Sequence, residues 1–416
     1  MEVTSIGFEA SLVVIYIKNY EEFSADTEIP KRIATAIRRR VDIRPDPSTL
    51  MNEDEVEKLL REMIPEDAEV EEIVFSPETG EITIEAVNTN AVLGDAGNRL
   101  KSLRKETGWN IKVVRAPPIH SKTISDVRGY LRNYSDVRQK MLHKVAKDLV
   151  RPLNTIGDDW VRVTALGGFR QVGRSAALLS TKNSKVLIDC GLDPGSDNTP
   201  YFNVPEALPI DSIDAVVITH AHLDHCGTLP ALFKYGYDGP VYCTPPTRDL
   251  MALLQLDNIK LGYGEAKKNL YSASDVRDEI MHTIPVKYGD TTDIAPDVRL
   301  TFQNAGHILG SAIAHFHVGD GLYNVAFSGD TKFEKTWLFN PAVNKFPRLE
   351  TLVIESTYGG RKDFQPSRKD ASEQLGEYIK EAVKGGGKVL IPVFAVGRSQ
   401  EVMLVIEELV RTGTIP

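Results

Sequence analysis

The sequence predicts a mixed α/β protein, in which two small α+β units precede a larger α/β sandwich. Over the first 150 residues, short β-branched segments alternate with segments of helical spacing. From about residue 161 onwards, short apolar strands alternate with glycine turns, and helical patterns are interspersed among them. This mixture is typical of a layered sandwich rather than of a helical bundle.

The first 150 residues carry strand and helix signals with recognisable ends. The PETG turn at 77–80 separates two alternating segments and therefore predicts a β-hairpin. Asn52 stands where a helix cap is expected, and Gly108 stands where a helix should end. We expect strands at 11–19, 41–48, 70–77, 80–88 and 110–118, and helices at 29–40, 52–64, 99–108 and over the basic stretch 119–150.

The second part of the chain has the denser strand pattern. We expect strands at 161–168, 175–181, 185–191, 214–220, 239–244, 298–307, 313–320, 322–330, 351–359 and 388–394. We expect helices at 228–236, 247–261 and 371–384, and a last helix from residue 399 that ends in a Gly/Pro turn. We find no internal repeat. At about 150 residues per domain, the length of 416 residues corresponds to two to four domains.

The composition excludes several classes of protein. With 42% hydrophobic and 26% charged residues, the chain is neither disordered nor low in complexity. No apolar run reaches the ~18 residues of a membrane span, and the N-terminus lacks the pattern of a secretory signal. The three cysteines, Cys190, Cys226 and Cys243, form no CxxC pair. We therefore expect a cytoplasmic protein without disulfides.

Charge is distributed unevenly, although the formal net charge is −9. Residues 53–85 contain thirteen acidic and two basic residues, whereas residues 99–151 contain fourteen basic and four acidic residues. Residues 31–44 add six basic residues against one acidic residue. The basic segments favour a polyanionic partner, and the alternative is a set of solvated helices whose charges aid solubility.

The strongest chemical signal is the THAHLDHCG segment, which follows a predicted strand directly. It supplies His220, His222, Asp224 and His225 within six positions, although the whole chain has only nine histidines. Four such side chains in a tight turn cannot converge on one ion, but they can serve two ions side by side. Imidazole and carboxylate donors together suit zinc, or manganese or iron. The alternative, a surface cluster of histidines, would not explain this concentration.

Three further candidate residues follow other predicted strands. His307 lies between glycines, Asp330 could bridge two cations with its carboxylate, and Asp189 ends a strand. Each of them alone could be a cap or turn residue. Together with the first cluster, however, they predict one site at one edge of the sheets.

These residues resemble the motifs of the metallo-β-lactamase superfamily, whose fold is an αββα sandwich. The pattern His-x-His-x-Asp-His matches residues 220–225, and the later single histidine and aspartate match His307 and Asp330. The first motif, an aspartate after a strand, matches Asp189.

The resemblance implies a role for each of these side chains. One zinc ion would be held by His220, His222 and His307. A second would be held by Asp224 and His225, with Asp330 bridging the two. Asp189 would contribute to catalysis by orienting ligands through hydrogen bonds.

Two later segments narrow the resemblance to one branch of the superfamily. LVIESTYGGR places Glu355 after a strand, and GGGKVLIPVFAVGRSQE follows. Both look like the beta-CASP branch, the nucleases of RNA and DNA processing. Glu355 matches the acidic residue of that branch's motif A, which implies a catalytic role and contact with an active-site histidine. A strand-end cap is the alternative for Glu355.

Residues 87–114 resemble a KH domain. The GxxG loop of that domain, which clamps about four nucleotides of a single strand, matches Gly94, Asp95, Ala96 and Gly97. The resemblance implies RNA contacts for this loop and for the basic residues that follow it, Arg99, Lys101, Arg104 and Lys105. Asp95 departs from the pattern because it places a negative charge where phosphate would bind, so a structural role is the alternative. The preceding unit resembles a degenerate KH domain without GxxG.

The complete order of motifs resembles the archaeal homologues of the cleavage and polyadenylation specificity factor nuclease, a family implicated in transcription termination. The resemblance implies a degenerate KH-like domain at 1–69, a KH domain with a basic linker helix at 70–150, a metallo-β-lactamase domain at 155–360 and the start of a beta-CASP domain at 361–416. It implies single-stranded RNA as a partner and makes RNA polymerase a candidate partner. The family is expected to dimerise through a C-terminal end that this chain lacks.

The activity implied is zinc-dependent hydrolysis of RNA phosphodiesters, in which Asp224 or Asp330 takes the proton of the attacking water. The beta-CASP branch adds two histidines after the strand at 388–394, but no histidine follows Phe394 here. We therefore expect a fragment, or one half of a split nuclease, that binds the second zinc weakly and cleaves RNA poorly alone. His315 and His317 share one face of a strand and are interpreted as packing residues.

Two other functions remain as alternatives. A metallo-hydrolase of small esters or thioesters would not need the KH-like units or residues 355–400. An RNA-binding regulator with a decayed site would not keep the ligand set from His220 to Asp330.

Overall fold

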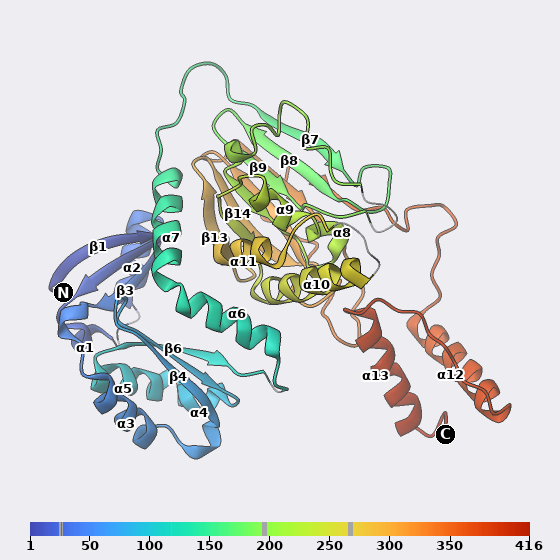
Figure 1. Cartoon of the computed structure of the whole chain (residues 1–416), viewed down its shortest axis with the longest axis horizontal. Coiled ribbons are helices and arrows are strands. Elements are labelled where there is room, and N and C mark those ends of the chain that lie inside the picture. The colour runs from blue at the N-terminus through green and yellow to red at the C-terminus, as the bar shows by residue number, and fades with distance from the viewer. Residues whose placement is uncertain (25, 27, 118, 194–197, 265–268) are drawn as a thin grey trace. The chain divides into compact units, whose positions relative to one another are not determined.

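The computed structural model describes residues 1–24, 26, 28–117, 119–193, 198–264 and 269–416. It divides into two compact units, Met1–Val150 and Arg151–Pro416 (Figure 1). Among the residues described, no helix combines the length and the apolar composition that a membrane span requires.

The first unit contains two sheets of the same topology. Its strands are β1 (Val3–Glu9), β2 (Leu12–Ile17), β3 (Arg40–Pro45), β4 (Val70–Ser76), β5 (Glu81–Ala86) and β6 (Asn110–Arg115). Its helices are α1 (Tyr20–Phe23), α2 (Glu28–Ile37), α3 (Glu53–Met63), α4 (Thr89–Leu93), α5 (Asn98–Thr107), α6 (Lys122–Asn133) and α7 (Ser135–Leu149).

Each sheet has three strands, in the orders β1-β2-β3 and β4-β5-β6. In each, the first pair is antiparallel and the second pair is parallel, with two helices between the second and third strands. The two sheets therefore repeat one topology, as expected of two KH-like units, although no internal repeat was found in the sequence. Strand β1 was also missed, because most of its residues are exposed and it carries no strong alternation.

Several predicted ends are confirmed by local hydrogen bonds. The Asn52 side chain accepts from the Asp54 amide and caps α3, and Gly108 ends α5 with a φ of 69°. Helix α2 ends three residues earlier than predicted, because Arg38 adopts a φ of 53° and Arg40 already begins β3. The basic stretch after 119 forms two helices rather than one. Of the strand expected at 110–118, Pro118 lies outside the described residues.

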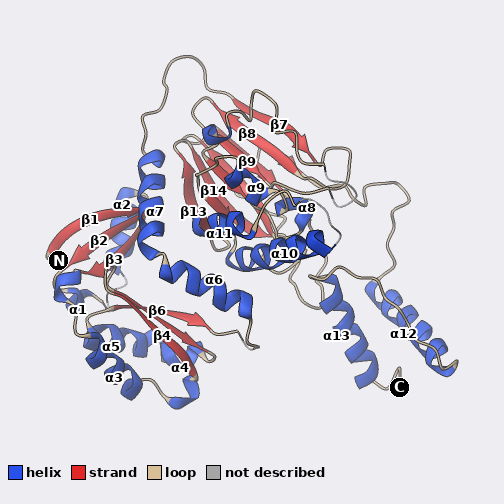
Figure 2. Ribbon diagram, viewed as in Figure 1, coloured by secondary structure: helices blue, strands red, loops and turns tan. Residues whose placement is uncertain are grey.

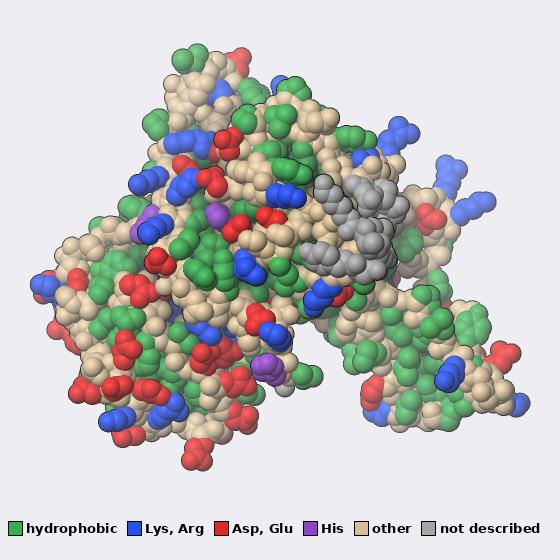
Figure 3. Space-filling model, viewed as in Figure 1, with side chains coloured by type: hydrophobic (Ala, Val, Ile, Leu, Met, Phe, Trp, Pro, Cys, Tyr) green, Lys and Arg blue, Asp and Glu red, His purple; other side chains and the backbone are tan. Residues whose placement is uncertain are grey.

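The second sheet of this unit packs against α3. Val56 and Leu60 of α3 lie in one apolar core with Ile82 and Ile84 of β5 and with Trp109. Three of the acidic residues of α3, Glu53, Asp54 and Glu55, lie in its first turn, and Figure 3 shows acidic side chains gathered on this part of the molecule. The boundary expected between residues 69 and 70 stays a prediction.

A buried arginine joins the two sheets of the first unit. Arg44 at the end of β3 is 1% exposed, and its guanidinium donates two hydrogen bonds to Glu9, of 2.7 and 2.8 Å. It also lies 2.9 Å from a carboxylate oxygen of Asp42 and 3.1 Å from one of Glu81. Burial raises the pKa of Glu9, but Arg44 outweighs that effect, so the pKa of Glu9 lies below its usual value.

The second unit is a sandwich of two sheets flanked by helices (Figure 2). The six-stranded sheet has the order β12 (Thr283–Pro285), β11 (Val241–Cys243), β10 (Ala215–Val217), β9 (Lys185–Ile188), β8 (Ala176–Thr181) and β7 (Val161–Gly167). The five-stranded sheet has the order β13 (Thr291–Ala295), β14 (Val298–Asn304), β15 (Ala312–Val318), β16 (Tyr323–Phe327) and β17 (Thr351–Val353). The helices are α8 (Leu223–Cys226), α9 (Leu229–Lys234), α10 (Pro245–Gly264), α11 (Ala273–His282), α12 (Arg368–Lys384) and α13 (Arg398–Arg411).

Strand alternation builds the layers of this sandwich. Leu179 and Val186 face the core between the two sheets, together with Phe302 and Phe316 of the opposite sheet. Their neighbours along the strands, such as Leu178, face a second core formed with α9 and α10. Because side chains alternate with a period of two, one apolar strand can serve both layers.

The structure contradicts one predicted strand of this unit. Residues 388–394 lie outside any strand, and Leu390 and Phe394 are 93% and 76% exposed. A strand needs a neighbouring strand to receive its backbone hydrogen bonds, and among the described residues none lies beside this segment. Strands β12 and β13 and helix α11 are additions that the sequence analysis did not predict.

We predict that Arg44→Ala destabilises the first unit by about 3–5 kcal/mol at neutral pH, because it leaves Glu9 and Glu81 without their buried cation. The folded-state pKa of Glu9 is depressed, so the stabilisation is present above the unfolded value of 4.5 and is lost as the pH falls below it. The loss caused by the substitution should therefore shrink in acid. Urea unfolding at pH 7 and pH 4 measures both effects.

Arg32→Ala, on the exposed face of α2, is the matched control and should change the free energy of unfolding by less than about 0.5 kcal/mol. Equal losses for the two substitutions, or a loss for Arg44→Ala that does not change with pH, would contradict the account of this ion pair.

Candidate metal centre

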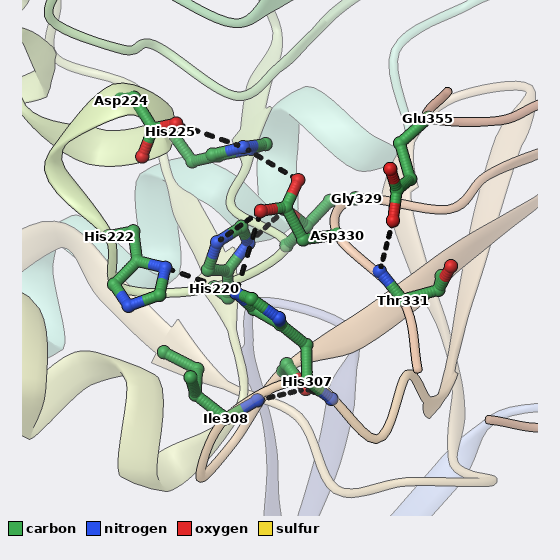
Figure 4. Close-up of polar contacts among 12 residues, drawn as sticks. His220, His222, Asp224, His225, His307, Ile308, Gly329, Asp330, Thr331 and Glu355 are labelled. Carbon is green, nitrogen blue, oxygen red and sulfur yellow. Dashed lines mark hydrogen bonds and ion pairs between the residues drawn. The ribbon is translucent and has the colours of Figure 1, made fainter. Parts of the chain in front are cut away.

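The predicted site residues come from loops that follow strands of both sheets. Asp189 follows β9 and His220 follows β10, and these two strands are parallel neighbours in the six-stranded sheet. His307 and Asp330 follow β14 and β16 of the other sheet. The strand ends therefore bring together side chains that are more than 100 residues apart (Figure 4).

Four of these side chains converge. One ligand atom from each of His220, His222, His307 and Asp330 lies within 4.8 Å of the others. His307 Nε2 lies 3.1 Å from His222 Nδ1 and 3.4 Å from Asp330 Oδ2, and His220 Nε2 lies 3.9 Å from the same oxygen. Three nitrogens and one carboxylate oxygen thus face one point.

The second carboxylate oxygen of Asp330 faces the other two predicted ligands, Asp224 and His225. Oδ1 lies 3.3 Å from His225 Nε2, and that nitrogen lies 3.8 Å from Asp224 Oδ2. Asp330 therefore stands between the two groups of side chains that the sequence analysis separated. The structure brings together all six residues that were predicted as metal ligands.

Asp189 lies behind the cluster rather than in it. Its carboxylate is 3% exposed and accepts hydrogen bonds from the Thr219 amide at 2.8 Å, the Thr219 hydroxyl at 2.9 Å and His225 Nδ1 at 2.7 Å. Because Nδ1 of His225 is engaged in this way, Nε2 is the nitrogen that faces Asp330. The sequence analysis did not single out Thr219, although it begins the THAHLDHCG segment.

The environment shifts the pKa values of the side chains in the cluster. Burial lowers the pKa of His220 and of His222, and lowers that of His307 to about 4. Burial would raise the pKa of Asp330, but hydrogen bonding and charge from His225 lower it to about 2. Burial likewise opposes protonation of His225, yet Asp189 and Asp330 hold its pKa well above the usual value. At neutral pH the imidazoles of His220, His222 and His307 are neutral and Asp330 is ionised, so these four side chains are ready to coordinate. His225 must lose its proton before it can bind a metal ion.

One atom in the cluster indicates that a cation belongs there. His220 is fully buried, and its Nε2 has no hydrogen-bond partner among the described residues. A buried nitrogen without a partner costs about 1–3 kcal/mol, which coordination of a metal would offset. The donor set of nitrogens with a carboxylate oxygen fits zinc.

Two glycines allow the loops to approach so closely. A Cβ at Gly191 would lie 1.7 Å from the backbone oxygen of Asp224, and one at Gly329 would lie 2.6 Å from the Thr219 hydroxyl. Gly329 also has a φ of 52°, which favours glycine. Larger residues at these positions would move Asp224 and Thr219, and with them the cluster.

Glu355 occupies a different position from the one expected. It was predicted to contact an active-site histidine, but its carboxylate accepts from the backbone amides of Thr331 at 3.3 Å and Thr357 at 3.0 Å (Figure 4). Its negative charge still acts on His307, whose pKa it raises slightly against the effect of burial. In this structure Glu355 fixes the backbone beside Asp330.

The predicted GxxG loop lines a groove in the first unit. Gly94 and Gly97 have φ values of 69° and 76°, and a Cβ at Gly94 would lie 2.6 Å from that of Arg99. The groove is lined by residues 90–91, 93–97 and 99. Asp95 and Ala96 are exposed at the tip of the loop.

Two of the basic residues predicted to contact RNA make hydrogen bonds within the fold, and their contact with RNA stays a prediction. The guanidinium of Arg104 donates to the backbone oxygen of Ile111 at 2.7 and 3.2 Å, and that of Arg99 donates to the backbone oxygen of Ala91. These bonds tie α5 to β6 and to α4. Lys105 is exposed and Lys101 is partly exposed, so both remain placed to meet a polyanion.

Comparison with known families agrees with this architecture. A family described as "Metallo-beta-lactamase superfamily" matches residues 169–382. A second, described as "Transcription termination factor FttA, KH domain", matches residues 1–50. The predicted fold class, with KH-like structure preceding a metallo-β-lactamase sandwich, is thereby confirmed.

Several archaeal proteins are similar over the whole chain. The protein named transcription termination factor FttA from Methanosarcina mazei is 51% identical over 416 residues, which are 100% of this chain and 65% of that protein. Proteins of the same name from Methanothermobacter thermautotrophicus and Pyrococcus horikoshii are 49% and 48% identical, and the chain covers 66% and 65% of their lengths. The chain thus spans about two thirds of these relatives.

We predict that the purified chain binds Zn²⁺ and that His220→Ala weakens this binding by at least about 100-fold, because changes to residues that merely support ligands already cost 10–100-fold. Competition with a chromophoric chelator measures the affinity. His143→Ala, an exposed histidine of α7, should leave it unchanged. Equal affinity for His220→Ala and the unsubstituted chain would exclude the cluster as the binding site.

Proposed function

The chain belongs to the metallo-β-lactamase superfamily, and we propose that it is a zinc-dependent ribonuclease that acts on single-stranded RNA in 3′-end processing and transcription termination. The observation that carries this proposal is that one chain holds the convergent His/Asp cluster, a match to a KH-domain family at residues 1–50 and a GxxG loop at 94–97. The relatives' names support the link to termination. The chain spans 65% of the first of them, and we propose that it carries the same activity.

The cluster suggests how the metal would be held. His220, His222 and His307 would hold one zinc ion, Asp224 and His225 a second, and Asp330 would serve both through its two oxygens. When bound, zinc supplies Lewis acidity toward water and toward the phosphodiester.

Asp224 or Asp330 would accept the proton of the attacking water. Their side chains are 30% and 29% exposed, whereas Asp189 is buried behind the cluster with its oxygens engaged. The Asp189 carboxylate instead holds His225 in one orientation and so keeps Nε2 directed at Asp330. Glu355 would support the same site by accepting hydrogen bonds from the backbone amides of Thr331, the residue after Asp330, and of Thr357.

RNA is the substrate class that the rest of the chain favours. Single-stranded RNA is the ligand of KH domains, in which a GxxG loop clamps the backbone. A hydrolase of small esters or thioesters would have no use for such a unit. RNA polymerase is a candidate partner because the relatives are named termination factors, and dimerisation stays a prediction.

We predict slow, zinc-dependent cleavage of a short unstructured RNA by this chain under single-turnover conditions, with loss of at least about 100-fold in rate for His222→Ala. End-labelled RNA separated on a denaturing gel gives the rate. Cleavage that survives both a chelator and His222→Ala would contradict the proposed site. Hydrolysis of a thioester without any cleavage of RNA would favour the alternative hydrolase.

We predict that Asp95→Lys raises the affinity for single-stranded RNA several-fold at low salt, because it replaces a negative charge at the loop with a positive one. Fluorescence anisotropy of a labelled RNA measures this effect. Glu106→Lys makes the same change in net charge at the exposed end of α5 and should have a smaller effect. Equal gains for both substitutions would mean that RNA is attracted by net charge alone and not bound at the GxxG loop.

A further inference from the structure

The metal centre is contacted by a segment that lies far from its motifs in sequence. His222 Nε2 lies 3.4 Å from the backbone oxygen of Val396, just before α13 begins at Arg398. The ring of Phe394 lies beside the same imidazole, with 6.1 Å between the ring centroids. A segment near residue 396 therefore covers one of the predicted metal ligands.

The contact with Val396 determines which nitrogen of His222 carries a proton. A carbonyl oxygen can only accept a hydrogen bond, so Nε2 must be the donor. Nδ1 then keeps its lone pair, and it is Nδ1 that lies 3.1 Å from His307 Nε2 inside the cluster. The second nitrogen of a ligating histidine commonly fixes the tautomer through such a bond.

The same segment packs against a second ligand. Gly397 has a φ of 91°, and a Cβ at this position would lie 2.5 Å from Cγ2 of Ile308. Ile308 is the residue after His307, and Figure 4 shows these two residues. Only glycine permits this approach without displacement. Two ligands from different sheets, His222 and His307, thus meet one segment.

Gln400 holds this segment in place from the first turn of α13. Its Oε1 accepts from the Gly397 amide at 2.7 Å, and its Nε2 donates to the backbone oxygen of Ala395 at 2.9 Å. The two bonds flank Val396 on both sides. Gln400 itself is exposed, so its removal would free the loop without opening a core.

We propose that residues 394–400 are a positioning element of the metal centre, in which the Val396 carbonyl holds His222 in the Nε2–H tautomer and Gln400 holds Val396. The inference rests on the metal centre proposed above and is independent of the RNA substrate. His222 then enters the centre with Nδ1 already oriented, which lowers the cost of binding the ion.

The test compares Gln400→Ala with Gln374→Ala in the whole chain. Gln374, an exposed glutamine of α12, also makes a side-chain hydrogen bond, to the Tyr378 hydroxyl, and serves as the matched control. Long-range ¹H–¹⁵N spectra of ¹⁵N-histidine-labelled protein report the tautomer, and His222→Asn identifies the signal. Titration with Co²⁺ gives the affinity and the visible absorption of the site.

We expect the Nε2–H tautomer of His222 in the unsubstituted chain and in Gln374→Ala. Gln400→Ala should show a mixture of tautomers, an altered Co²⁺ spectrum and an affinity lower by about 10–100-fold. A second pair of variants gives the same comparison. Gly397→Ala should behave like Gln400→Ala, and Gly386→Ala, the control, should behave like the unsubstituted chain. Both glycines have positive φ values, but a Cβ at Gly386 would meet nothing within 4 Å.

The outcomes separate this inference from the proposed function. If the unsubstituted chain binds no Co²⁺, the metal centre itself is overturned. If it binds Co²⁺ and Gln400→Ala binds it equally well with an unchanged tautomer, the metal centre stands and the positioning role is overturned.

Discussion

The buried carboxylate of Asp189 is the constraint on which the metal centre depends. Its oxygens accept three hydrogen bonds, two from Thr219 and one from His225, so it joins the end of β9 to the loop after β10 and to α8. Asp189 itself adopts a φ of 57°, a left-handed conformation that aspartate tolerates better than most residues. The order of the strands thus determines the position of the Asp189 carboxylate, and the hydrogen bond from His225 to this carboxylate determines the orientation of the His225 imidazole.

Asp330 makes the corresponding connection from the opposite sheet. One of its oxygens faces His220 and His307, and the other faces His225. The distance between these groups is set by the apolar core between the sheets, in which residues such as Leu179 and Phe302 interdigitate. The geometry of the metal centre therefore depends on the packing of the sandwich, because a change in the spacing of the sheets would move Asp330 away from the histidines.

The sequence was informative where function depends on side chains that lie close together in the chain. The THAHLDHCG motif identified four candidate ligands, and strand ends identified His307 and Asp330, because strands that end at one edge converge there. The hydrogen bonds that Arg99 and Arg104 make within the fold could not be foreseen in this way. A basic residue after a GxxG loop looks the same in sequence whether it faces solvent or a backbone oxygen of its own fold.

Other features could not be read from residue types at all. Residues 388–394 have the composition of a strand, but a strand forms only where another strand accepts its hydrogen bonds, which local pattern does not specify. The contact of His222 with Val396 involves a backbone oxygen, which every residue possesses. Topology repeats between the two sheets of the first unit while the pattern of exposed residues does not, so the two KH-like units were predicted from their resemblance to KH domains and not from an internal repeat.

The central claim is that the residues around Asp330 form a metal centre that spans both sheets. Anomalous diffraction at the zinc absorption edge, from crystals of the chain soaked in Zn²⁺, tests it most directly. The account predicts an anomalous peak among His220, His222, His307 and Asp330, and at higher zinc concentration a second peak between Asp330, His225 and Asp224. Zinc found only at other residues, with these side chains left without it, would contradict the account.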